Sequence, residues 1–161
     1  MDFIDLKQQQ KLIRKNVDKR IARVLDHGKY IQGPEITELE NELSLFSKSK
    51  FVLCCSSGTD ALVLGLIALG LKPHEGVIVP SFTFASTAEA VCMLGGLPFF
   101  SDVKVDTYNM CEESIANSIN KAKKIGINLK GIITVGLFGQ PSDMDKIKKI
   151  ASANNLWVFD D

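Results

Sequence analysis

The sequence predicts an α/β fold built around an open, mostly parallel sheet. From residue 51 onward, short apolar runs rich in strand-forming residues alternate with stretches whose apolar residues recur at helical spacing. The runs are continuously apolar, which is typical of strands that are buried on both faces. Strands that alternate with helices are joined by right-handed crossovers, so we expect neighbouring strands to run parallel.

Two helices are expected before the first strand. Apolar residues recur at helical spacing along 7–27, and Gly28 provides a C-terminal stop. A second helix is expected to begin at Gly33-Pro34, because proline is tolerated at the first helical position. We therefore divide the chain into an N-terminal helical segment, 1–50, and an incomplete α/β domain, 51–161.

The first helix carries every arginine of the chain, namely Arg14, Arg20 and Arg23. They could form a phosphate-binding surface. A charged outer face is the rule for amphipathic helices, however, and we favour that interpretation.

The α/β domain is expected to contain five strands and four helices. The strands are expected at 51–55, 77–80, 98–102, 131–135 and 156–159, and the helices at 60–69, 85–94, 112–124 and 143–153. Gly70 and Gly95 are suited to end two of these helices, and Ser142 is a fair N-cap for the last.

Composition excludes several classes of function. The chain has 161 residues, of which 45% are hydrophobic and 24% charged, the balance of an ordinary globular protein. Its formal net charge is +0, so it lacks the basic excess of a protein that binds nucleic acid or an anionic membrane. No apolar run is long enough to cross a bilayer, and the first residues do not resemble a signal peptide.

The four cysteines follow neither a zinc-binding nor a redox pattern. Most of their neighbours are apolar, so we interpret Cys54, Cys55, Cys92 and Cys111 as small hydrophobic residues of a protein in the reducing cytoplasm. We expect no metal site.

Ligands of open α/β sheets bind outside the carboxyl ends of the strands, so the residues that follow each strand are the candidates for chemistry. After the first expected strand, Ser57-Gly58-Thr59 opens a helix, where free backbone amides favour a phosphate. This turn lacks the lysine of a Walker A loop and the spaced glycines of a dinucleotide fingerprint. After the second strand come Phe82 and Phe84, and aromatic residues at such positions are more often core than cofactor contacts.

Asp161 follows the last buried strand, where a carboxylate needs a cationic partner. An acid, an aromatic ring and a phosphate-binding turn together suit a planar, cationic heteroaromatic phosphate. Pyridoxal 5'-phosphate is such a molecule, and an acid beside its pyridinium nitrogen is one way in which proteins tune it.

Motifs along almost the whole chain resemble the DegT/DnrJ/EryC1/StrS family of sugar aminotransferases, which are fold-type-I enzymes that depend on pyridoxal phosphate. The opening and the Gly-Gln-Pro motif look most like the branch that aminates C3 of UDP-linked 3-keto-hexuronic acids for surface polysaccharide. In chain order, the matching motifs lie at 3–6, 30–35, 57–62, 79–89, 106–109 and 138–145.

The resemblance implies a role for individual residues. Gly58 and Thr59 look like the phosphate-binding amides, with Ser57 shaping the turn. Phe84 looks like the aromatic residue that stacks on the pyridine ring. Asp161 corresponds to the aspartate that pairs with the pyridinium nitrogen, and its neighbour Asp160 is expected to lie outside direct cofactor contact.

The family pattern continues beyond Asp161 with a lysine that forms the Schiff base with the cofactor. None of the 16 lysines falls at a position that matches it. We therefore expect the chain to be the N-terminal portion of a longer enzyme, containing part of the large domain of the fold and no catalytic residue of its own.

The implied function is transamination of a nucleotide-linked keto sugar of the UDP type, with an amino-acid donor that is typically glutamate. The resemblance also implies a homodimer. The charge balance, the apolar runs and the cysteines indicate a cytoplasmic protein without nucleic-acid or membrane partners. The alternative is a catalytically inactive remnant, or a split subunit that needs a separate C-terminal piece. A phosphate-binding α/β protein unrelated to transaminases does not explain the ordered set of motifs.

Overall fold

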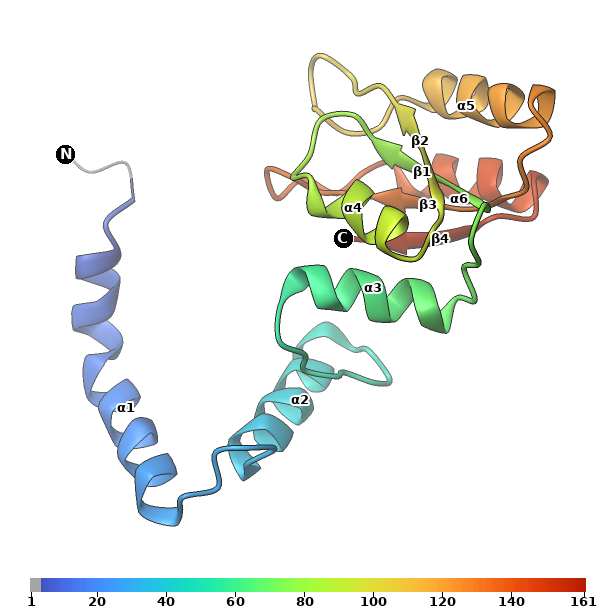
Figure 1. Cartoon of the computed structure of the whole chain (residues 1–161). Helices are drawn as coiled ribbons and strands as arrows, with labels where there is room; N and C mark the ends of the chain where they lie inside the picture. The colour runs from blue at the N-terminus through green and yellow to red at the C-terminus, as the bar shows by residue number, and fades with distance from the viewer. Residues whose placement is uncertain (1–3) are drawn as a thin grey trace. The chain divides into compact units, whose positions relative to one another are not determined.

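The computed structural model describes residues 4–161, which divide into two compact units (Figure 1). The first unit ends at Cys54 and the second runs from Cys55 to Asp161. The first contains helices α1 (Leu6–His27) and α2 (Pro34–Ser47). Gly28 adopts the left-handed conformation that ends α1, and Pro34 occupies the start of α2 after Gly33, as expected from the sequence.

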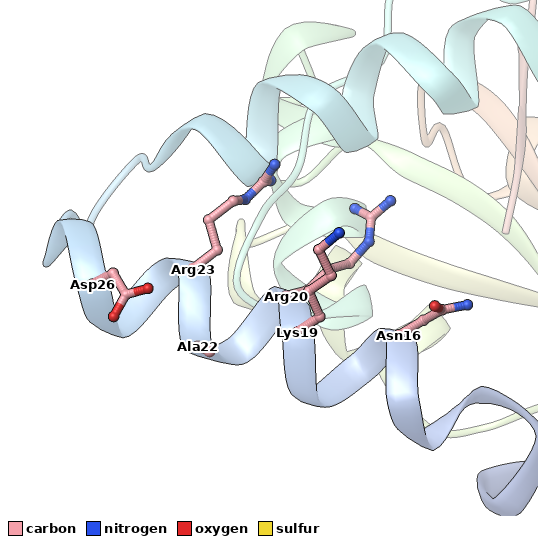
Figure 2. Close-up of a pocket in the computed structure, with 6 residues that line it drawn as sticks. All are labelled: Asn16, Lys19, Arg20, Ala22, Arg23 and Asp26. Atoms are coloured by element: carbon pink, nitrogen blue, oxygen red, sulfur yellow. The ribbon is translucent and has the colours of Figure 1, made fainter.

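The arginines of α1 pair with carboxylates in the same unit. Arg23 lies 2.8 Å from Glu35 and 2.7 Å from Glu38 of α2, and Arg14 pairs with Asp18 one turn away in α1. Figure 2 shows Arg20 and Arg23 extending from α1 beside a pocket of about 680 Å³. All residues that line this pocket belong to α1, so no second element brings groups to converge on a ligand. These contacts favour the interpretation of a charged helix face over a phosphate site.

The second unit is an α/β domain with a four-stranded parallel sheet, which confirms the predicted fold class. Its strands follow the order β2-β1-β3-β4 across the sheet. The strands are β1 (Gly76–Pro80), β2 (Leu97–Ser101), β3 (Leu129–Thr134) and β4 (Trp157–Asp160), and the helices are α3 (Gly58–Ala68), α4 (Ser86–Met93), α5 (Glu112–Lys124) and α6 (Met144–Ala153).

Helices cover both faces of the sheet, and alternating residues of the strands divide between two cores (Figure 1). Val77 and Val79 of β1 pack with buried residues of α3 and α4. Ile78, between them, points to the opposite face and packs with buried residues of α5 and α6. All five residues of β1 are buried, as a continuously apolar run predicts.

The expected strand at 51–55 is wrong. This segment has no regular secondary structure, and the side chains of Phe51 and Leu53 are 81% and 79% exposed. Strand-forming residues become a strand only where another strand offers hydrogen bonds, because β-propensity depends on tertiary context. Here the backbone amide of Cys54 donates instead to the Glu40 carboxylate, at 2.8 Å.

The expected N-cap of the last helix is displaced by one residue. The carboxylate of Asp143, rather than the hydroxyl of Ser142, accepts a hydrogen bond from the backbone amide of Lys146, and α6 begins at Met144. Asp and Ser are nearly equal as N-caps, so composition alone does not distinguish two adjacent candidates.

Candidate active site

A pocket of about 450 Å³ lies where the loops after β1 and β3 meet the start of α3. β1 and β3 are adjacent in the sheet, but the chain leaves β1 toward β2 on one side and continues from β3 to β4 on the other. Such a switch point leaves a crevice outside the carboxyl ends of the strands. The pocket is lined by Gly58, Thr59, Thr83, Phe84, Ser86, Val135, Gly136, Leu137 and Asp161.

The turn before α3 is fixed by hydrogen bonds between side chains and backbone. The Ser57 hydroxyl accepts from the backbone amide of Asp60 at 3.1 Å and donates to the Asp60 carboxylate at 3.0 Å. The hydrogen bond from the Ser56 hydroxyl is the main cause of a lowered pKa of Asp60, and the hydrogen bond from Ser57 lowers it further. Ser57 therefore shapes the turn, and it is the one predicted site residue that does not line the pocket.

Gly58 and Thr59 are the first residues of α3, where backbone amides have no acceptor within the helix. A Cβ atom added at Gly58 would meet no other atom within 4 Å, so the backbone there is open to the pocket. An exposed helix N-terminus favours an anion through its free amides and its dipole.

Phe82 and Phe84, in the loop after β1, have different surroundings. Phe84 lines the pocket and is 73% exposed, which leaves its ring available to a ligand. The ring of Phe82 instead contacts Tyr108 and Phe138, with centroids 5.5 Å and 6.4 Å away. Neither ring lies in the core, contrary to the usual tendency of aromatic residues that follow a strand.

Asp160 and Asp161 have separate hydrogen-bond partners. The Asp161 carboxylate accepts a hydrogen bond from the Thr87 hydroxyl at 2.7 Å and lines the pocket. The Asp160 carboxylate accepts a hydrogen bond from the Thr134 hydroxyl and does not line the pocket. The alternation of side chains along a strand explains why two adjacent acids diverge.

Sequence reasoning missed several residues of this site. Thr83, in the loop after β1, and the segment 135–137, directly after β3, lie where the strand-end rule places candidates, but they were not assigned to the cofactor. Thr87 carried no comparable signal, because its partner Asp161 is 74 residues away in the sequence.

Other candidate groups are absent from the described part of the chain. Residues 4–161 contain no cluster of three or more His, Cys, Asp or Glu side chains that could hold a metal ion, and all four cysteines are free. No lysine lines the pocket. In the same residues, no helix is both long enough and apolar enough to span a membrane.

Comparison with known proteins identifies the family. Residues 11–161 match the DegT/DnrJ/EryC1/StrS aminotransferase family. The chain belongs to this family. The prediction made from the motifs is therefore confirmed, and with it the dependence of the family on pyridoxal phosphate.

This chain is similar to a UDP-2-acetamido-2-deoxy-3-oxo-D-glucuronate aminotransferase of Pseudomonas aeruginosa. The two sequences are 43% identical over 100% of this chain and 43% of the relative. Its fold matches the crystal structure of a DegT DnrJ EryC1 StrS aminotransferase from Brucella abortus with a TM-score of 0.96 and 40% identity, over 99% of this chain and 43% of the other. It also matches NtdA from Bacillus subtilis with bound cofactor PMP, with a TM-score of 0.83 and 34% identity, over 91% of this chain and 32% of the other. The chain thus spans less than half the length of these relatives.

Proposed function

We propose that this chain forms part of the cofactor-binding domain of an aminotransferase that acts on a nucleotide-linked keto sugar. The observation that carries the proposal is the pocket at the switch point. It brings together Gly58, Thr59, Phe84 and Asp161, which are four of the five residues that the family motifs assign to the cofactor.

The residues present fit pyridoxal phosphate. The open backbone at Gly58, at the N-terminus of α3, suits a phosphate group. The exposed ring of Phe84 offers a flat apolar surface to the pyridine ring. The Asp161 carboxylate, the one acid in the pocket lining, offers a partner to a pyridinium nitrogen.

Each of these residues has a distinct task in the proposed reaction. When bound, the cofactor supplies an electron sink for a carbanion formed beside it. Asp161 holds a proton on the pyridine nitrogen, because a carboxylate stabilises the cationic ring by direct charge pairing. The amides at the start of α3 anchor the phosphate, and Phe84 excludes water from one face of the ring.

The amino group must be transferred with the help of a base that moves a proton between the substrate and the cofactor. In the family this base is the Schiff-base lysine, and no lysine lines the pocket of this chain. We propose that this lysine belongs to a part of the enzyme outside the 161 residues. The alternative function, an inactive or split subunit, predicts the same pocket without a lysine.

The substrate class is proposed from the Pseudomonas aeruginosa relative, whose name specifies a UDP-linked 3-oxo sugar acid. Glutamate as donor and a homodimer as the assembly are proposed from the family resemblance alone. Free cysteines suit the cytoplasm, which we propose as the location.

A nitrogen-transfer experiment tests this function. The full-length enzyme that carries these residues is incubated with pyridoxal phosphate, ¹⁵N-glutamate and UDP- or dTDP-linked 3-keto sugars, and the products are analysed by mass spectrometry. We expect ¹⁵N in the amino group of a nucleotide sugar. Release of 2-oxoglutarate without labelled sugar would contradict the acceptor class, and neither product would contradict the proposed reaction.

A further inference from the structure

A buried hydroxyl reaches the carboxylate of Asp161 from a different element. Thr87 is the second residue of α4 and its side chain is fully buried, with 0% of its surface exposed. Its Oγ1 donates a hydrogen bond of 2.7 Å to Oδ2 of Asp161. A buried hydroxyl without a hydrogen-bond partner costs free energy, so the bond to Asp161 stabilises this arrangement of the side chains.

A second hydrogen bond fixes the backbone of the same aspartate. The Asp161 amide donates to the carbonyl of Thr134 at 2.8 Å, which holds the residue against the end of β3. These two hydrogen bonds attach the Asp161 backbone to β3 and Oδ2 of its carboxylate to α4. Among residues 4–161, Oδ1 of Asp161 has no hydrogen-bond partner, while the residue lines the pocket.

The neighbouring acid provides an internal comparison. The hydroxyl of Thr134, also fully buried, donates to the Asp160 carboxylate. At the end of β4, two exposed aspartates thus each accept a hydrogen bond from a buried threonine, and only the pair formed by Thr87 and Asp161 involves a pocket residue.

We propose that Thr87 is a positioning residue: its hydroxyl orients the Asp161 carboxylate so that Oδ1 meets the pyridine nitrogen of the cofactor. This inference rests on the proposed function, because it requires a pyridinium ring beside Asp161. Without the hydroxyl, the carboxylate loses a charge-assisted hydrogen bond and turns toward other partners, so the ring nitrogen is less well paired.

The test compares matched variants of the full-length enzyme. Thr87→Val removes the hydroxyl with little change in shape, Thr87→Ser retains it, and Thr134→Val removes the equivalent hydroxyl from the other pair. Two quantities are measured: the dissociation constant of pyridoxal phosphate, and the ¹⁵N chemical shift of the pyridine nitrogen of labelled cofactor as a function of pH.

For Thr87→Val we expect a dissociation constant about tenfold higher, the typical effect of one hydrogen bond to a charged group. We also expect the bound pyridine nitrogen to lose its proton at lower pH than in the unchanged enzyme. Thr87→Ser should restore both values, and Thr134→Val should leave both close to those of the unchanged enzyme. A merely structural role of Thr87 would not move the nitrogen titration.

Asp161→Asn separates this inference from the proposed function. If Asp161→Asn shifts the nitrogen titration while Thr87→Val does not, the role of Thr87 is overturned and that of Asp161 stands. If Asp161→Asn also has no effect, both are overturned. An equal shift in Thr134→Val would overturn the specific role of Thr87. Thr87→Ala replaces Thr87→Val if the latter does not fold, and the shift is read only from cofactor bound to folded protein.

Discussion

Asp160 and Asp161 are identical side chains on adjacent residues, and the structure gives them different surroundings. The alternation of side chains along β4 directs one acid toward Thr134 and the other toward Thr87 and the pocket. The sequence alone could not rank them by composition. Asp161, the acid that the family motif assigns to the cofactor, is the one that lines the pocket.

We predict that Asp161→Asn lowers kcat of the full-length enzyme by two or more orders of magnitude, while Asp160→Asn has a mild effect. Asp161→Asn removes the carboxylate that we propose pairs with the pyridinium nitrogen of the cofactor. Leaving the other charge of such a pair unpaired costs several kcal/mol. Steady-state kinetics of the two variants with glutamate and the keto sugar measure the difference. Equal losses, or a larger loss for Asp160→Asn, would show that the assignment of these two acids is wrong.

Other individual residues in and around the pocket were predictable to different degrees. The Ser57-Gly58-Thr59 turn was recognisable because a serine N-cap and a glycine at a helix start leave a local signature. Thr87 was not recognisable, since a threonine early in a helix has no local feature that reveals a hydrogen bond to a distant aspartate.

At the scale of elements, local patterns were sufficient where the structure depends on local interactions. α5 has the predicted bounds, Glu112–Lys124, and left-handed glycines follow α3 and α4 where expected. The segment 51–55 shows the limit of this approach. Its residues favour a strand, but a strand also needs hydrogen bonds from a neighbour, which a one-dimensional pattern does not contain.

Helix α3 allows a matched pair of glycine substitutions. A Cβ atom at Gly58 would meet no atom within 4 Å, whereas a Cβ atom at Gly65 would lie 2.4 Å from Cζ of Phe159 in β4. We predict that Gly65→Ala lowers the free energy of unfolding by about 1–2 kcal/mol, because overpacking outweighs the better helix propensity of alanine. Gly58→Ala should leave stability unchanged or slightly higher. It should weaken cofactor binding about tenfold, because its Cβ atom would occupy open space from which a phosphate approaches the backbone amides, lengthening about one hydrogen bond to the charged group.

Thermal unfolding and cofactor titration of both variants check this pair of expectations. Gly58→Ala serves as the control for the general effect of alanine in α3, and Gly65→Ala for the effect of altered packing on cofactor binding. Unchanged stability of Gly65→Ala would mean that α3 and β4 can separate without cost. Unchanged affinity of Gly58→Ala would remove the start of α3 from the phosphate site.

For the whole molecule, the alternation of strands and helices predicted a parallel sheet, but it did not predict the order of the strands. The order β2-β1-β3-β4 places β1 and β3 side by side and so creates the crevice between their loops. Strand order depends on which helices cover which face, and this follows from packing over the whole domain. The site is therefore a product of topology as well as of its motifs.

The proposed reaction needs a lysine, which the pocket of this chain does not contain, and this leads to a prediction for the isolated chain. None of the residues that line the pocket is a lysine. Lysines outside the pocket would react with pyridoxal phosphate without selectivity. We predict that the isolated chain shows no transaminase turnover with glutamate. After addition of pyridoxal phosphate and reduction with borohydride, mass spectrometry should find adducts spread over several lysines. A single stoichiometric adduct at one lysine, together with turnover, would contradict this prediction.

Recovery of turnover when the remaining part of the enzyme is added as a separate polypeptide would support the split-subunit alternative, because the pocket would then receive its lysine from the second chain.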